Sequence, residues 1–156
     1  MTDQSETVEL ELKSGTVRIE LLSDVAPNHV NRIKELIREG FYDGLVFHRV
    51  ISGFMAQTGD PTGTGTGKSR KPNLKAEFSA EPHLRGMCSM ARSGDPNSAN
   101  SQFFICLADS PWLDGQYSVW GRVVSGMEHV DGIKKGSSAN NGAVIDPDRI
   151  IKMTLP

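Results

Sequence analysis

The side chain with the clearest chemical potential in this sequence is that of Arg49, in a stretch from Phe47 to Asp60 that reads FHRVISGFMAQTGD. The surrounding apolar residues predict a β-strand over Leu45–Val50. An unpaired guanidinium is costly to bury, and no acidic residue lies between Gly44 and Gly59. Two interpretations stay open. Arg49 points to solvent from an edge of the sheet, or it lies in an apolar groove and directs its five N–H donors at a ligand's amide or carbonyl.

A second predicted strand, Phe54–Thr58, places a glutamine beside a large apolar side chain. Residues two apart in a strand share a face, so Met55 and Gln57 lie together, while Phe54 and Ala56 lie on the opposite face. A core face rarely carries a glutamine, and an ordinary solvent-exposed face rarely carries a methionine. The face that holds Met55 and Gln57 therefore needs a further explanation.

A third predicted strand, Gln102–Leu107, repeats this combination. Gln102 and Phe104 share one face, and Phe103 and Ile105 share the other. Such a mixture is typical of an apolar binding groove in which a few polar groups orient the ligand. The alternative is the partly covered outer surface of a barrel, and these two strands alone do not decide between the two.

Local patterns predict the elements that lead up to these strands. Alternating apolar residues at 8–12 and 17–21, separated by a turn at Lys13–Gly15, indicate an N-terminal β-hairpin. A helix is expected to begin at Pro27, where the missing N–H costs nothing. Its apolar residues follow helical spacing, and Gly40 is expected to end it as a left-handed cap.

Short strand patterns dominate the remaining sequence. Further strands are predicted over Gly86–Ala91, Ser118–Val124 and Arg149–Thr154. A second helix is predicted to begin near Met127, to carry two lysines in its last turn, and to end before Gly136. Eight strands and only two helices predict a mainly β fold, either a closed barrel or a sandwich.

The chain as a whole has the size and charge of one ordinary domain. Its 156 residues can bury a core without disulfides or metals, and we expect a mobile tail over residues 1–6 and a single domain over residues 7–156. A net charge of −2 gives no reason to expect a nucleic-acid partner. The sequence opens without a leader pattern and holds no apolar run of the roughly 18 residues that a membrane span needs. We therefore expect a cytoplasmic protein without a membrane partner, in which Cys88 and Cys106 are buried, reduced thiols.

Two features that resemble cofactor motifs fail on their spacing. The run from Gly63 to Ser69 is similar to a phosphate-binding loop, but Thr62 stands where the pattern needs glycine, and Pro72 opposes the helix that should follow. The four histidines lack metal-ligand spacing, and the aspartates near residue 146 lack the spacing of a calcium loop. We expect neither a cofactor nor a metal.

Three segments together resemble the signature segments of the cyclophilins, which are peptidyl-prolyl cis–trans isomerases. They read FHRVISGFMAQTGD, MARSGDPNSANSQFFI and WLDGQYSVWGRV, in the family's order and at compatible spacing. The resemblance covers about residues 8–155. It implies a closed eight-stranded antiparallel β-barrel capped by two α-helices, with a packed core inside and the substrate groove on the outer face.

The resemblance also implies a set of site residues. Arg49 matches the family's catalytic arginine, Gln57 the glutamine beside it, and Phe104 a wall of the pocket that takes the proline ring. The residues expected to bind substrate are Phe54, Met55, Gly65, Ala91, Arg92, Ser93, Gln102, Trp112, Leu113 and Tyr117. His48 matches a family histidine, but alternation directs it away from Arg49, so it is expected to be structural.

Several positions depart from the family pattern or refine it. Tyr117 stands where many members have a histidine that bonds the substrate, and its hydroxyl can still form a hydrogen bond. Arg92 replaces an asparagine whose contact in the family is mainly through the backbone, so activity should survive while peptide preference shifts. The Thr62–Asn73 loop is shorter than in long-looped members, which leaves the match of Gly65 open. Members with a tryptophan at the position of Trp112 tend to bind cyclosporin A, so we expect this chain to bind it.

The resemblance implies an enzyme that accelerates rotation about X–Pro peptide bonds and assists protein folding. Its partners would be proline-containing peptides and unfolded or folding proteins, and it would act as a monomer. An alternative is a non-catalytic module that holds proline-containing segments in the same groove. The enzyme is favoured by the presence of Arg49, Gln57, Met55 and Phe104 together, because a module that only binds has no need of an arginine directed at a twisted amide. A general chaperone would require large exposed apolar patches, which the sequence does not clearly show.

Overall fold

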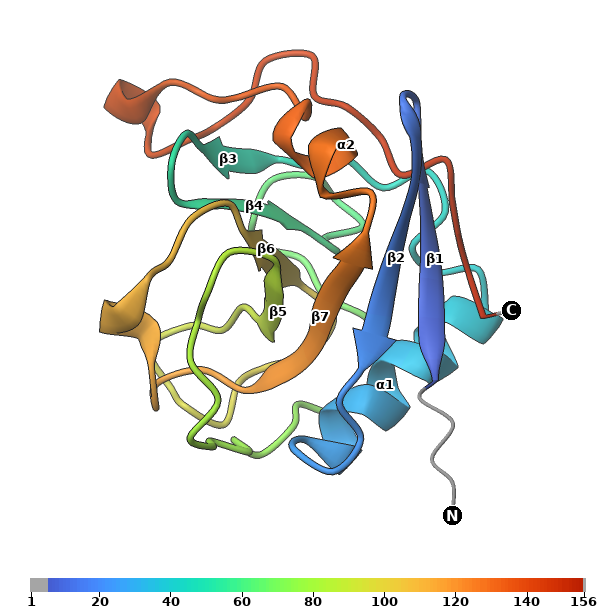
Figure 1. The fold of residues 1–156 in the computed structure, drawn as a ribbon, viewed down its shortest axis with the longest axis vertical. Helices are drawn as coiled ribbons and strands as arrows, with labels where there is room; N and C mark the ends of the chain where they lie inside the picture. The colour runs from blue at the N-terminus through green and yellow to red at the C-terminus, as the bar shows by residue number, and fades with distance from the viewer. Residues whose placement is uncertain (1–5, 156) are drawn as a thin grey trace.

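The computed structural model describes residues 6–155, so most of the expected tail, residues 1–5, lies outside the described residues. Figure 1 shows the elements, and their bounds in chain order are β1 (Thr7–Leu12), β2 (Gly15–Leu21), α1 (Pro27–Arg38), β3 (Arg49–Ile51), β4 (Met55–Thr58), β5 (Met87–Met90), β6 (Phe103–Cys106), η1 (Pro111–Leu113), β7 (Val119–Ser125), α2 (Met127–Asp131), η2 (Ser138–Asn140) and β8 (Lys152–Thr154). The mainly β class with two α-helices is as predicted. No helix in residues 6–155 is long and apolar enough to cross a membrane.

The eight strands form one curled antiparallel sheet in the order β3-β4-β6-β5-β7-β2-β1-β8. The expectation of a closed barrel is not confirmed, because β3 and β8 are the two edges of the sheet and it is open between them. Irregular pairing crosses this opening, with Phe47 N–H donating to Asp148 O at 2.9 Å and Gly44 N–H donating to Ile150 O at 2.7 Å. Gly44 has a φ of 81°, which no regular strand contains. Of the strand predicted over Leu45–Val50, only an isolated bridge of Val46 to Arg149 precedes β3, which begins at Arg49.

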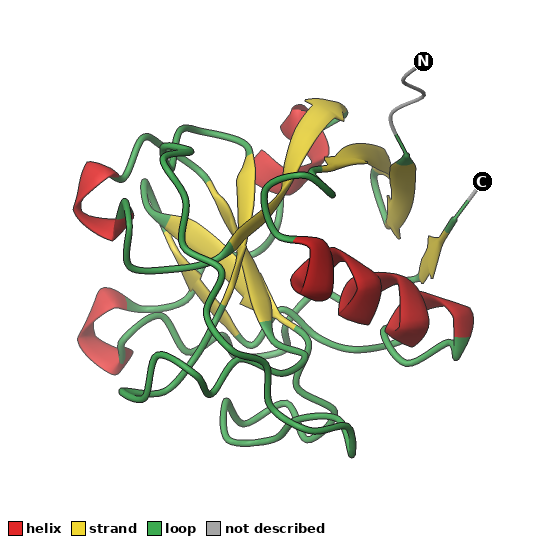
Figure 2. Ribbon diagram, turned by 90° about the horizontal axis from the view of Figure 1, so that it is seen from below, coloured by secondary structure: helices red, strands yellow, loops and turns green. Residues whose placement is uncertain are grey.

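Two helices lie at opposite ends of the curled sheet (Figures 1 and 2). Helix α1 begins at Pro27, as predicted, and buries one apolar stripe against the sheet. Gly40, with a φ of 70°, turns the chain away after the helix ends. Helix α2 is shorter than expected and ends at Asp131, because Gly132 is a poor helix residue and caps it.

The core lies on the concave side of the sheet. Ala56, Phe103, Ile105 and Trp120 are completely buried there, in agreement with the predicted alternation along the strands. The N-terminal hairpin pairs with Leu12 opposite Gly15 at the turn. The buried face that stabilises the fold is thus the face that the period-2 pattern of the sequence predicts to be apolar.

The opposite face of β4 and β6 carries a second, smaller apolar cluster. Its buried members are Met55, Phe104, Cys106 and Leu113, and the residues packed against them are Ile51, Phe54, Ala91 and Tyr117. The register of β4 on β6 sets Gln57 opposite Phe104, and that of β3 on β4 sets Arg49 opposite Gln57. The outward side chains of three adjacent strands, β3, β4 and β6, therefore form this face.

Both cysteines are free and buried, and burial raises the pKa of the Cys106 thiol to about 12.

Candidate active site

Arg49 lies half-buried at the start of β3, and neutral acceptors hold its guanidinium. Its Nε–H donates to Asn141 O at 2.9 Å, one terminal nitrogen donates to Gln57 Oε1 at 3.1 Å, and the other donates to Asn141 Oδ1 at 3.1 Å. Within residues 6–155 no ion pair of Arg49 occurs. Its positive charge is thus fixed in place without being neutralised, and the simple interpretation of a solvent-pointing arginine does not hold.

An apolar cavity of about 110 Å³ opens beside Arg49. The residues that line it are Arg49, Phe54, Met55, Gln57, Ala91, Arg92, Phe104, Leu113 and Tyr117. This volume is a few times that of a water molecule in the liquid, about 30 Å³, and suits a small ring. All nine residues belong to the set expected from the sequence. Apolar side chains and a few polar groups line it together, which is typical of a ligand site.

Phe54 reaches this cavity from a different element than the alternation predicted. It lies in the turn before β4 rather than within the strand, so the period-2 rule does not apply to it. Its ring packs against Trp112 with the centroids 5.5 Å apart. Trp112 is 63% exposed at the rim, as expected for a residue that an incoming ligand could cover.

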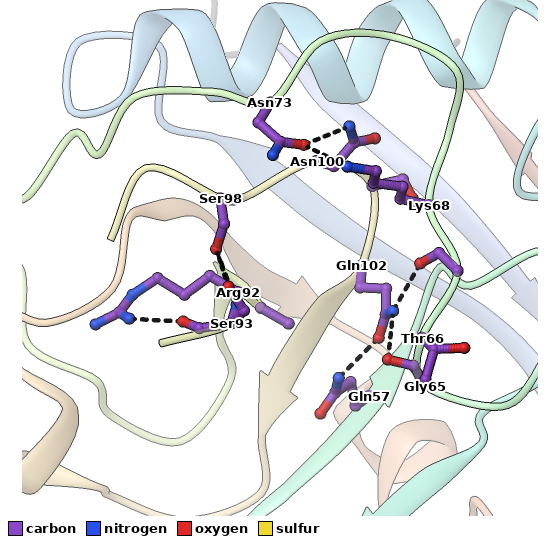
Figure 3. A pocket seen from close by; sticks show the side chains of 13 residues that line it. Gln57, Gly65, Thr66, Lys68, Asn73, Arg92, Ser93, Ser98, Asn100 and Gln102 are labelled. Atoms are coloured by element: carbon purple, nitrogen blue, oxygen red, sulfur yellow. Dashed lines mark hydrogen bonds between the residues drawn. The ribbon is translucent and has the colours of Figure 1, made fainter. Parts of the chain in front are cut away.

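A second, larger cavity of about 440 Å³ adjoins the first and shares Gln57, Ala91 and Arg92 with it (Figure 3). Gln57 donates to Gln102 Oε1 at 2.9 Å. Gln102 in turn donates to Gly65 O at 3.1 Å and to Gly67 O at 2.8 Å. This chain of amides connects Arg49 to the loop on the far side of the second cavity and fixes which way each glutamine faces.

Gly65 lies at the edge of this second cavity, so the expected loop residue does reach the site. Asp60 holds the loop by accepting hydrogen bonds from the backbone of Thr62 and Thr64 at 2.7 and 3.1 Å. Burial alone would raise the pKa of Asp60. Hydrogen bonds from Thr62 and from the backbone of Gly67 and Gly65 outweigh it and lower the pKa to about 2. Asp60 is not among the site residues expected from the sequence, although an aspartate before a Thr/Gly run is a known turn signal.

Arg92 contributes its side chain as well as its backbone. It donates to Gln116 O from Nε at 3.1 Å and from a terminal nitrogen at 2.8 Å, and to Ser93 O at 2.9 Å. The guanidinium also lies over the Tyr117 ring, 4.7 Å from its centroid. Arg92 therefore ties the strip at residues 91–93 to the segment that carries Tyr117, a contact that the family pattern does not imply.

His83, which the sequence analysis did not select, supports the cavity from behind. Its ring is nearly parallel to that of Phe104, with the centroids 6.2 Å apart, and nearly perpendicular to that of Tyr117. Nδ1 lies 3.1 Å from Asp114 Oδ1 and Nε2 lies 2.9 Å from Ser89 Oγ. A carboxylate only accepts, so Nδ1 carries the proton and Nε2 accepts from the Ser89 hydroxyl. Burial lowers the pKa of His83 despite the nearby Asp114, which favours this neutral form.

One further histidine, His48, and one asparagine, Asn141, complete the surroundings of Arg49. His48 is buried, and burial lowers its pKa although Asp60 opposes the shift. Asn141, which binds Arg49 twice, was not selected from the sequence. The only local signal for it is the Asn-Gly pair with Gly142, which is typical of turns.

The sequence matches the model of the family described as "Cyclophilin type peptidyl-prolyl cis-trans isomerase/CLD" over residues 7–155. A probable peptidyl-prolyl cis-trans isomerase of Brucella suis is 58% identical over 164 residues, covering 98% of this chain and 84% of that protein. A peptidyl-prolyl cis-trans isomerase of Schizosaccharomyces pombe is 42% identical, covering 93% of this chain and 96% of that protein.

Solved structures agree with this assignment. A cyclophilin-type isomerase of Cryptosporidium parvum superposes with a TM-score of 0.90 at 28% identity and 98% coverage of both chains. A second structure of that protein was solved in the presence of the dipeptide Ala-Pro and gives a TM-score of 0.88 at 28% identity, covering 96% of this chain and 98% of that one. The fold and the matches together define an isomerase of X–Pro peptide bonds. The chain belongs to the cyclophilin-type peptidyl-prolyl cis–trans isomerase family.

Proposed function

We propose that the two adjoining cavities bind a proline-containing peptide and that Arg49 catalyses rotation about its X–Pro bond. The proline ring enters the smaller cavity, against Phe104, Met55 and Leu113. The peptide backbone follows the strip at residues 91–93 and Gln102 beside the larger cavity. Tyr117 and the exposed Trp112 contact the substrate from the rim.

To accelerate the reaction, the protein must stabilise the twisted amide relative to both planar isomers. Resonance gives the C–N bond double-bond character and a barrier of about 18–20 kcal/mol. Both isomers of an X–Pro bond are populated, because the trans form is favoured by only about 0.5–1 kcal/mol. Only interactions that are stronger in the transition state than in either planar form accelerate the rotation.

Arg49 meets this requirement with the N–H groups that do not already donate to Gln57 or Asn141. When the amide twists, the proline nitrogen regains a lone pair and can accept a hydrogen bond, whereas the planar amide nitrogen offers no such acceptor. The guanidinium is charged at every relevant pH, so it donates without a change of protonation. Its donor faces an apolar cavity, where an electrostatic interaction is stronger than in water.

The apolar walls provide the second part of the mechanism. Met55, Phe104 and Leu113 are nearly fully buried and hold the proline ring still, while the acyl side of the bond is free to turn. Because the proline side of the bond is held still, the binding contacts orient the reacting amide relative to Arg49. No covalent bond forms or breaks in this scheme.

A half-buried, unneutralised arginine beside an apolar cavity is the observation that carries this proposal. The test is exchange NMR of a short Ala-Pro peptide with catalytic amounts of the protein, for wild type and Arg49→Ala. We expect kcat/KM to fall at least a hundredfold in the variant, by analogy with the loss of one directed donor in other enzymes. If the Arg49→Ala protein kept near wild-type kcat/KM, Arg49 would have no catalytic role. Slow exchange in both proteins, together with peptide shifts on binding, would indicate a binding module instead.

We further propose a cellular role in which the protein acts as a cytoplasmic monomer on proline-containing segments of folding chains. The groove lies on the outer face of the sheet, so an extended segment could enter without unfolding the enzyme. We also propose that cyclosporin A occupies this groove, with the exposed Trp112 as its contact at the rim. Titration calorimetry with wild type and Trp112→Ala measures this binding directly.

A further inference from the structure

The loop at residues 137–143 pairs with the edge of β3 that β4 leaves free. Val50 N–H donates to Gly142 O at 2.9 Å, and Val144 N–H donates to His48 O at 3.1 Å. An isolated bridge also joins Arg49 to Ala143. Arg49 is therefore placed between β4, which carries Gln57, and a loop that is distant in sequence.

Two consecutive left-handed residues shape this loop at its contact with Arg49. Asn141 has a φ of 55° and Gly142 a φ of 82°. Asparagine tolerates this conformation better than most residues. At Gly142 the chain passes so close to β3 that a Cβ atom would lie 3.2 Å from Arg49 Cγ. The turn thus sets Asn141 against the guanidinium with both its backbone and its side-chain oxygen available.

The hydrogen-bond inventory of Arg49 shows how much of its placement depends on Asn141. A guanidinium has five N–H donors. Nε–H donates to Asn141 O, one terminal N–H to Asn141 Oδ1 and one to Gln57 Oε1. Two donors remain, one on each terminal nitrogen. Asn141 therefore accepts two of the three fixed bonds, and it does so without a charge that would neutralise the guanidinium.

We propose that Asn141 is a positioning residue of the isomerase, which holds the Arg49 guanidinium so that a free N–H points at the twisted amide. This inference rests on the catalytic role proposed for Arg49. An arginine side chain has many rotamers, and a displacement of about 1 Å at a reacting centre can cost on the order of a hundredfold in rate. Without the Asn141 Oδ1 acceptor, one terminal nitrogen of Arg49 loses its fixed partner, and the bonds to Gln57 Oε1 and to the backbone oxygen of residue 141 restrict the guanidinium less.

The variant that isolates this effect is Asn141→Gly. Glycine accepts the left-handed φ and keeps the backbone oxygen, so only the Oδ1 acceptor is lost. Ala139→Gly is the matched control, because it loosens the same loop at an exposed residue whose side chain forms no hydrogen bond. Both proteins are assayed for kcat and KM on an Ala-Pro peptide, and their thermal unfolding is recorded.

We expect Asn141→Gly to lower kcat roughly tenfold with KM changed less than twofold, since the proline pocket is untouched. Ala139→Gly should stay near wild type. If Asn141→Gly behaves like Ala139→Gly, the inference is wrong. Equal KM and kcat effects in Asn141→Gly would also overturn it, because they would indicate a general disturbance of the site.

A double-variant cycle separates this inference from the role of Arg49 itself. If Asn141 acts through Arg49, then Asn141→Gly should cause no further loss in an Arg49→Ala background. A tenfold further loss there would show that Asn141 acts independently and would overturn the inference. Wild-type kcat in Arg49→Ala would overturn the catalytic proposal as a whole. A reduced kcat in Arg49→Ala with an unchanged kcat in Asn141→Gly would overturn only the positioning role.

Discussion

At the scale of single residues, Phe104 shows how one side chain serves both the fold and the site. One face of its ring lines the proline-sized cavity, and His83 stacks behind it with the centroids 6.2 Å apart. Tyr117 meets the ring edge-on, with the centroids 5.6 Å apart. These two aromatic contacts keep the cavity wall rigid, and the bonds of His83 to Asp114 and Ser89 prevent this support from turning.

Shortening Phe104 should weaken capture of the proline ring. In Phe104→Leu we expect KM for a proline peptide to rise severalfold, and in Phe104→Ala a larger rise together with a loss of about 3–5 kcal/mol of stability. Steady-state kinetics at temperatures where both variants are folded, checked by circular dichroism, measure this. Unchanged KM and kcat in a folded Phe104→Ala protein would contradict the role given to the ring.

At the scale of elements, the end of β4 is packed against β6 so closely that only glycine fits between them. Gly59 has a φ of 96°, and a Cβ there would overlap the Ser101 carbonyl oxygen and lie 2.8 Å from Gln102 Cα. Ser101 Oγ also donates to Gly59 O at 2.8 Å. This contact sets the distance between β4, which carries Gln57, and the segment just before β6, which carries Gln102, so the amide chain of the site depends on it.

Replacing Gly59 with alanine should therefore cost more than backbone strain alone. Gly53 provides the matched control, since its φ of 73° is also left-handed but nothing lies within 4 Å of its added Cβ. We expect Gly53→Ala to lower the free energy of unfolding by about 1–2 kcal/mol and Gly59→Ala by roughly 1–3 kcal/mol more. Urea unfolding of the two variants tests this, and equal losses would show that the strands separate without cost.

At the scale of the whole molecule, three histidines are packed into the fold in a way that makes it sensitive to acid. His29, His48 and His83 are all buried, and burial lowers the pKa of each. In the unfolded chain a histidine has a pKa near 6.5, so below that pH the unfolded state binds more protons than the folded state. Stability should therefore fall as the pH drops from about 6.5 towards the lowered pKa values.

The size of this effect follows from proton linkage. Each such histidine removes up to about 1.4 kcal/mol of stability per pH unit between its two pKa values. Asp60 adds a separate loss at lower pH, because its pKa of about 2 lies below the unfolded value near 3.9, and its contribution disappears as the pH falls through that range.

Urea unfolding at pH 7.5, 6.5 and 5.5 measures this dependence. We expect a small loss between pH 7.5 and 6.5, a larger loss between pH 6.5 and 5.5, and a shallower dependence in His83→Gln, which has no titrating ring. Equal free energies of unfolding at pH 7.5 and 5.5 would contradict the assignment of these histidines as neutral in the fold.

The amino-acid sequence by itself determined the mainly β class, most strand positions, the start of α1 and the face that carries Met55, Gln57, Gln102 and Phe104. These are local properties, because alternation and capping depend on residues a few positions apart. It also contained the motifs that resemble the cyclophilins, and the family match confirms that resemblance.

Only the tertiary structure decided how distant segments meet. Asn141 binds Arg49 across 92 positions of sequence, and His83 reaches the back of Phe104 from a segment without regular structure. The turn that brings Phe54 into the cavity breaks the alternation that predicted otherwise, and the two edges of the sheet, β3 and β8, do not pair with each other as regular strands. Such contacts depend on register and chain reversal, which no local pattern of side chains encodes.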